Sequence, residues 1–141
     1  MFAAFRDSLA PSAELYIEYM DTKRFFDPDH IDAFYDYLEA KYRGMRFDAV
    51  VAADDAAYRF RLAHESVLFG DVPTVFCGVN EYDAADLEGR SGITGVVEKL
   101  AIEDTIELML RLHPAAPAFV VITDNTLNGR ANATRVRSYA E

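Results

Sequence analysis

The sequence has little that would fix its structure covalently or carry it through a membrane. Cys77 is its single cysteine, which excludes a disulfide within the chain. No apolar run approaches the ~20 residues that a transmembrane helix needs. The first residues lack the charged and apolar regions of a signal peptide. If the protein is exported, we expect its targeting segment to lie outside this chain.

Basic residues are also in the minority. The 14 Lys and Arg residues are set against 24 Asp and Glu residues, giving a formal net charge of −10. Because a phosphate backbone is bound by clustered Lys and Arg, this balance argues against nucleic acid as a partner. Hydrophobic residues make up 51% of the 141 residues, enough to build one sizeable core. We therefore expect one globular domain over residues 1–141.

Strand-like and helix-like stretches alternate along the chain, which is typical of a parallel sheet covered by helices. The stretch 14–20 alternates in polarity, as an edge strand does. Continuous apolar runs predict buried strands elsewhere, and residues 93–97 predict a shorter one. The expected strands are 14–20, 49–53, 73–79, 93–97 and 118–123, and the expected helices are 2–10, 28 to a stop at Gly44, 55–67, 101–112 and 127–139. The pattern predicts an α/β fold with a mostly parallel, doubly wound, Rossmann-like sheet of about five strands and helices on both faces.

Polar pairs follow three of the expected strands. Ligands of open parallel sheets bind outside the carboxyl ends of the strands, where these pairs would meet. Their short side chains can accept hydrogen bonds or face an ammonium group, so we predict a ligand-binding site there. Capping of the following helices is the competing interpretation. The predicted ligand-binding residues are Asp54, Asp55, Asn80, Glu81, Asp124 and Asn125.

Catalytic chemistry has weaker support. A small metal-dependent α/β enzyme that holds a divalent cation with Asp54, Asp55 and Asp124 is the main alternative. A phosphorylated receiver domain would need a Lys after the last strand, and none follows Thr123. Phosphate-binding loops and the G-x-S-x-G elbow are absent. Cys77 lies in an apolar strand, where a buried thiol that reacts slowly is expected. We therefore expect no enzyme, no catalytic residue, no cofactor and no bound metal.

Several segments, taken in order, resemble a known family. They are 18–25 (EYMDTKRF), 47–57 (FDAVVAADDAA), 72–80 (VPTVFCGVN), 92–98 (GITGVVE) and 110–114 (LRLHP). This series is similar to the ABC-transporter substrate-binding-protein-like sensor domain. That domain is the extracytoplasmic input of bacterial sensor histidine kinases and diguanylate cyclases.

The resemblance implies a type I periplasmic-binding-protein fold, in which two Rossmann-like lobes hold a small solute in the cleft between them. Residues 1–97 would belong to the first lobe and residues 98–141 would begin the second. The resemblance further implies a periplasmic or extracytoplasmic location within a membrane-anchored receptor. Closure of the cleft would signal solute binding to other domains of the same parent chain. A purely structural or dimerisation domain is a third interpretation.

Compared with the family, the chain lacks the opening strand before Met1 and most of the second lobe after Glu141. It therefore looks like a fragment of a longer receptor. The missing strand would lie between 14–20 and 49–53, so strand 49–53 would expose an unpaired apolar edge. We expect residues 118–123 to fill this gap by folding back within the chain, or a homodimer to cover it.

Overall fold

The computed structural model describes residues 13–25 and 27–140, so the helix expected at 2–10 lies outside the described residues. Four α-helices appear where the sequence predicts them. The second of them, α3, is followed by a π-helical turn, and a 3-10 turn precedes the last strand. The helical elements are α2 (Pro28–Lys41), α3 (Asp55–Ala63), η1 (Glu65–Phe69), η2 (Ala84–Leu87), α4 (Ile102–Leu112) and α5 (Leu127–Ala140). None of the helices in the described part is long and apolar enough to cross a membrane.

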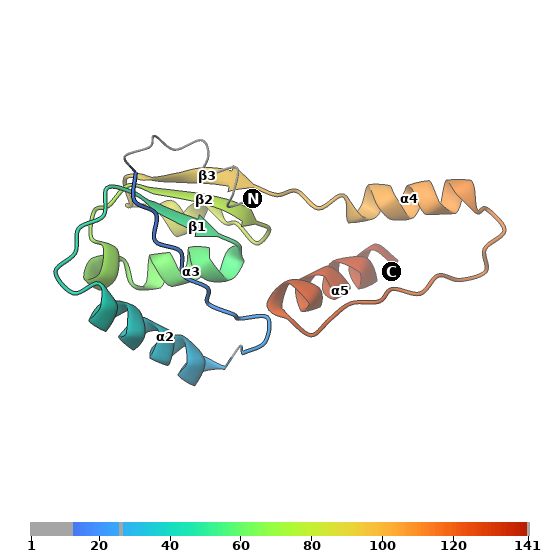
Figure 1. The fold of residues 1–141 in the computed structure, drawn as a ribbon. Coiled ribbons are helices and arrows are strands. Elements are labelled where there is room, and N and C mark those ends of the chain that lie inside the picture. The colour runs from blue at the N-terminus through green and yellow to red at the C-terminus, as the bar shows by residue number, and fades with distance from the viewer. Residues whose placement is uncertain (1–12, 26, 141) are drawn as a thin grey trace.

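The sheet has three parallel strands in the order β1-β2-β3. They are β1 (Val50–Ala53), β2 (Thr74–Val79) and β3 (Ile93–Val97). Thr74 is the partner of Val50 on one side and of Ile93 on the other, so the three strands start almost level. Their carboxyl ends point toward α5 (Figure 1). The α/β class and the parallel arrangement are therefore confirmed.

The core lies between this sheet and α3. The Tyr58 ring of α3 is fully buried, and its centroid lies 4.8 Å from that of Phe76 in β2. Ala52 and Val79 complete the buried cluster. Gly95 of β3 faces the same cluster, since a Cβ atom there would overlap the carbonyl oxygen and the ring of Phe76. The absence of a side chain at position 95 therefore leaves the space that the Phe76 ring occupies.

A buried arginine fixes the other end of α3. The Arg61 guanidinium donates from Nε to Thr74 Oγ1 over 2.9 Å. Its Nη2 donates to the carbonyl oxygens of Gly70 and Val72, each over 3.3 Å. Burial lowers the pKa of Arg61. These bonds tie the end of α3 to the loop that enters β2, and so they set where β2 begins.

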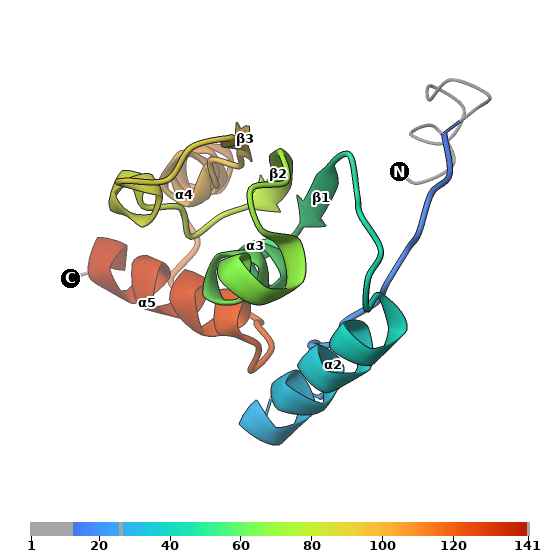
Figure 2. The same cartoon turned by 90° about the vertical axis from the view of Figure 1, so that its left-hand side faces the viewer.

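Helix α2 forms a further layer, on the side of α3 that faces away from the sheet (Figure 2). Asp27 caps it by accepting a hydrogen bond from the backbone N–H of His30 over 2.9 Å, and Pro28 starts it. Aromatic pairs join α2 to α3. The ring centroids of Phe34 and Phe60 are 5.3 Å apart, and those of Tyr35 and His64 are 4.6 Å apart.

The prediction of a strand at residues 14–20 is wrong. This segment has no regular secondary structure and pairs with no strand among residues 13–25 and 27–140. Its alternate side chains instead contact the end of α2. Glu18 accepts hydrogen bonds from Lys41 and Tyr42, and the Tyr16 ring meets the Tyr42 ring edge-on at 5.8 Å. Burial and the Glu18 contact raise the pKa of Tyr42 to about 12. The polar alternation therefore reflects packing on a helix rather than an edge strand.

The prediction of a strand at residues 118–123 is wrong as well. Residues 117–124 have no regular secondary structure and join α4 to α5 within a loop that projects beyond the sheet (Figure 1). Val120 is 87% exposed and Ile122 is 93% exposed. The predicted sheet of about five strands is therefore not confirmed. A strand exists only where a neighbour supplies hydrogen bonds, and neither 14–20 nor 118–123 has such a neighbour in the described part of the chain. The expected fold-back of 118–123 between 14–20 and 49–53 is wrong for the same reason.

One face of the sheet is open in the described part of the chain. Val51 and Val75 are each 46% exposed and Val96 is 69% exposed, so the expected burial of β1 and β2 on both faces is wrong. Cys77 points to this face and is half-buried, which corrects the expectation of a fully buried thiol. The physical reason is the path of α4. Helices were expected on both faces of the sheet, but α4 leads away from the sheet and leaves this face open (Figure 1).

The packing of His64 against Tyr35 and Phe60 predicts a pH-dependent stability. Burial lowers the pKa of His64 below its ordinary value of 6.5, and the charge of Asp32 only partly opposes this. The unfolded chain therefore takes up a proton first as the pH falls through about 6.5. We expect the melting temperature to drop by a few degrees between about pH 7.5 and about pH 5.5.

The measurement is thermal unfolding followed by circular dichroism across this range. His64→Phe keeps the aromatic stack and should flatten the slope. The matched control is His113→Gln, since His113 is exposed at the end of α4; it should keep the slope of the parent chain. An unchanged slope in His64→Phe would contradict the assignment.

Candidate functional site

The carboxyl edge of the sheet is organised by one buried carboxylate. Asp55, the first residue of α3, is 1% exposed. Its Oδ1 accepts the backbone N–H of Asn80 over 3.1 Å and that of Glu81 over 2.9 Å. Its Oδ2 lies 3.5 Å from the Asn80 side-chain amide nitrogen. The predicted pairs after β1 and β2 are therefore brought together by direct hydrogen bonds.

Asp54 occupies the turn between β1 and α3. Its φ of 84° lies in the left-handed region, which is uncommon for a residue with a side chain. Its carboxylate accepts the N–H of Asp55 over 2.7 Å, and its own N–H donates to the Cys77 carbonyl over 2.9 Å. The side chain remains 45% exposed. Asp54 thus both caps α3 and presents an accessible carboxylate at the edge.

Asn80 and Glu81 differ in what their side chains do. The Asn80 Oδ1 atom is buried and has no hydrogen-bond partner among the described residues. Glu81 forms an ion pair with Arg135 of α5, with 3.0 Å between Oε1 and Nη2. Asn80 therefore offers an unused acceptor at the edge, whereas the Glu81 carboxylate is already paired.

Asp124 and Asn125 precede α5 at the same edge. Asp124 Oδ1 accepts bonds from the backbone N–H of Thr126 over 3.0 Å and from its hydroxyl over 2.5 Å. These bonds hold the pKa of Asp124 below its usual range, and the charge of Lys23 lowers it further. Asn125 is exposed. Because Lys23 also lies 3.8 Å from Asp54, its ammonium group links the Asp54 side of the edge to Asp124.

Lys23 and Arg135 were missed by reasoning from the sequence. Lys23 lies in a turn before α2, and Arg135 lies in the middle of α5. Each reaches the edge from a segment that is distant in the sequence and carries no motif. The polar character of α5 predicted a solvated face, but it did not indicate that Arg135 would pair with Glu81.

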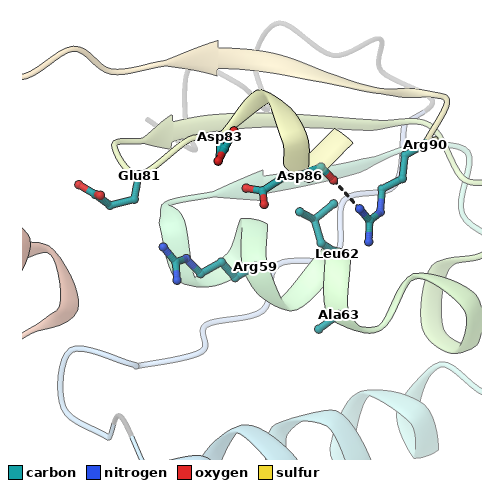
Figure 3. A pocket seen from close by; sticks show the side chains of 7 residues that line it. All are labelled: Arg59, Leu62, Ala63, Glu81, Asp83, Asp86 and Arg90. Atoms are coloured by element: carbon teal, nitrogen blue, oxygen red, sulfur yellow. Dashed lines mark hydrogen bonds between the residues drawn. The ribbon is translucent and has the colours of Figure 1, made fainter. Parts of the chain in front are cut away.

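A shallow groove of about 430 Å³ lies beside this edge, between α3 and η2 (Figure 3). Arg90, at one end, is paired with Glu65 over 2.9 Å and also donates to the Asp86 carbonyl. Of the predicted site residues only Glu81 reaches the groove. Its lining residues are Arg59, Leu62, Ala63, Glu81, Asp83, Asp86 and Arg90.

The proposed metal ligands do not form a metal site. Within residues 13–25 and 27–140, no group of three or more His, Cys, Asp or Glu side chains is placed to hold an ion. Both oxygens of Asp55 face protein donors, and Asp124 Oδ1 is occupied by Thr126. The Asp54, Asp55 and Asp124 carboxylates therefore act as helix caps and as a backbone clamp in this structure.

Comparison with known proteins adds no relative. No family model matches the chain, and neither a curated protein nor a solved structure matches it.

The geometry predicts that Asp55 is a stability determinant. Asp55→Ala would remove the acceptor of the Asn80 and Glu81 backbone N–H groups. Bonds of backbone N–H groups to a carboxylate contribute about 1.5–3 kcal/mol each, so we expect a loss of about 3 kcal/mol or more in the free energy of unfolding. Urea unfolding of both proteins measures this loss.

The matched control is Asp29→Ala. Asp29 is also an aspartate in the first turn of a helix, but it is exposed. It should cost only a few tenths of a kcal/mol. Equal losses for the two variants would show that the Asp55 clamp contributes little.

Proposed function

We propose that this chain is a solute-binding lobe of an extracytoplasmic sensor in a signal-transduction receptor, such as a histidine kinase or a cyclic-dinucleotide signalling protein. The observation that supports this most is the convergence of Asp54, Asn80 and Asp124 with Lys23 at the carboxyl edge of a parallel sheet. That edge is where open α/β sheets bind ligands. The resemblance of the sequence to the sensor family gives the same assignment.

The chemistry of the edge suggests the class of solute. Asp54 carries an accessible carboxylate, and Asn80 Oδ1 is an acceptor without a partner among the described residues. Lys23 supplies a positive charge next to them. A small polar solute with an ammonium or other N–H donor would pair with the two oxygens, and a carboxylate on the same solute would face Lys23. We therefore propose a small zwitterionic or cationic amine as the ligand class.

The proposed mechanism is a shift between two arrangements of the lobes. Asp124 and Arg135 belong to the chain after residue 98, whereas Asp54 and Asn80 belong to the chain before it. A solute held by both groups stabilises the arrangement in which they are close. Domains of the parent protein would then respond to this change. The metal-dependent enzyme remains the alternative, but no observation at the edge favours it.

The test is a screen of small amines, amino acids and carboxylic acids by thermal shift, followed by NMR titration of the isotope-labelled chain. We expect binders to carry an amine and to perturb the amide signals of residues 54, 55, 80 and 81. Asp54→Asn should weaken binding about tenfold or more, the equivalent of losing one charge-assisted hydrogen bond.

The control variant is Asp71→Asn, an exposed aspartate just before β2 at the opposite edge. It should leave the affinity unchanged. Binding that perturbs only the groove residues of Figure 3, or that is insensitive to Asp54→Asn, would contradict this site.

A further inference from the structure

Strand β1 has one unused edge. Its inner side pairs with β2 from Val50 to Ala53. On its outer side the described part of the chain places no strand, so a row of backbone N–H and C=O groups is left without a partner there. An open edge of this kind is a template for the addition of another strand. The edge is apolar and uncharged along its whole length.

The same chain carries a segment suited to such an edge. Residues 118–123 read AFVVIT, a series of mostly β-branched and aromatic residues that favour strands. No backbone hydrogen bond is formed within this segment or to another described residue. Val120 and Ile122 are almost fully exposed. The segment therefore has unpaired backbone groups and uncovered apolar side chains at once.

The charge distribution favours contact between residues 118–123 of one copy of the chain and the β1 edge of another copy. Each copy carries a net charge of −10, so most of their surfaces repel one another. Residues 114–123 contain no charged residue, and neither does β1. Two copies can therefore approach through these surfaces without bringing like charges together.

The loop that carries residues 118–123 runs away from β1 of the same chain. In doubly wound sheets a strand that follows three strands in this order commonly joins the outer edge of the first. Here the segment of residues 98–126, which contains α4, leaves β3 and returns at α5, projecting beyond the carboxyl ends of the strands (Figure 1). The ion pair of Arg135 with Glu81 holds α5 at the same edge. Residues 118–123 are thus presented outward, while no described residue pairs with the β1 edge that suits them.

We infer that two copies of this chain associate by exchanging these segments, residues 118–123 of each copy pairing along the outer edge of β1 of the other. Each copy holds both halves of the contact, so two copies close the assembly and leave neither half unpaired. The exchange also brings the exposed α4 leucines, Leu108 and Leu112, to the side of a partner sheet whose Val51 and Val75 are uncovered. Burial of these apolar side chains adds to the backbone pairing.

The test uses the full chain of 141 residues. Light scattering coupled to size-exclusion chromatography, from micromolar to near-millimolar protein, should show a rise from 15.8 kDa toward twice that mass. Added salt should strengthen the association, because it screens the repulsion between the two acidic copies. Hydrogen exchange should show the amides of 118–123 protected only at concentrations where the dimer forms.

Val121→Asp places a charge inside the exchanged strand and should weaken the association at least tenfold. The control is Val67→Asp, at an exposed valine of η1 away from both surfaces; it should associate like the parent chain. Circular dichroism checks that both variants fold. The inference is overturned by a monomer at every concentration, whether 118–123 is unprotected or protected within that monomer. A dimer that Val121→Asp leaves intact overturns it equally.

Discussion

The arrangement of the carboxyl edge depends on one constraint, the need of the buried Asp55 carboxylate for hydrogen bonds. An ionised group removed from water is tolerated only when donors replace its hydration. The donors here are backbone N–H groups of Asn80 and Glu81, which belong to the chain leaving β2. Because the acceptor sits on the first turn of α3, the end of β2 and the start of α3 are held at a fixed distance. Asp54 is then left in a strained turn with its carboxylate outward.

The opposite end of α3 is also fixed by a buried charged side chain that needs hydrogen bonds, here a positively charged one. Arg61 is buried and donates to two backbone carbonyls and a threonine hydroxyl at the start of β2. One helix is therefore clamped to one strand at both ends by side chains that bond mainly to backbone groups. Such bonds depend on the path of the chain rather than on the identity of the neighbouring side chains. Between the clamps, Tyr58 and Phe76 need only fill the space, which explains how a three-stranded sheet covered on one face keeps a defined core.

Local signals predicted the parts of the fold that local chemistry decides. Asp27 and Pro28 start α2 and Asp54 caps α3, because a cap bonds to the N–H groups of its own helix. The strands at 14–20 and 118–123 were predicted wrongly. An apolar or alternating run shows that a segment can form a strand, but it does not show whether a neighbouring strand is there to pair with it. The same limit applies at the site. The sequence placed Asp54 and Asp55 at the carboxyl edge, yet it could not show that Asp55 is buried and occupied while Asp54 is exposed. Lys23 lies at the edge because of the path that the chain takes before α2. No residue near Lys23 in the sequence indicates this path.

The site and the proposed association are connected through the segment of residues 98–126, in which α4 is followed by a loop. Asp124 and α5, which carries Arg135, stand at the end of this loop. If a partner holds residues 118–123, the loop loses freedom and the position of Asp124 relative to Asp54 becomes restricted. A solute bound between those carboxylates restricts the same distance. Two events that order one segment must favour each other when they require the same position of the segment, and oppose each other when they do not. If association strengthens solute binding, the exchanged loop holds Asp124 and Asp54 in the arrangement that binds the solute. If association weakens solute binding, the loop holds them in a different arrangement.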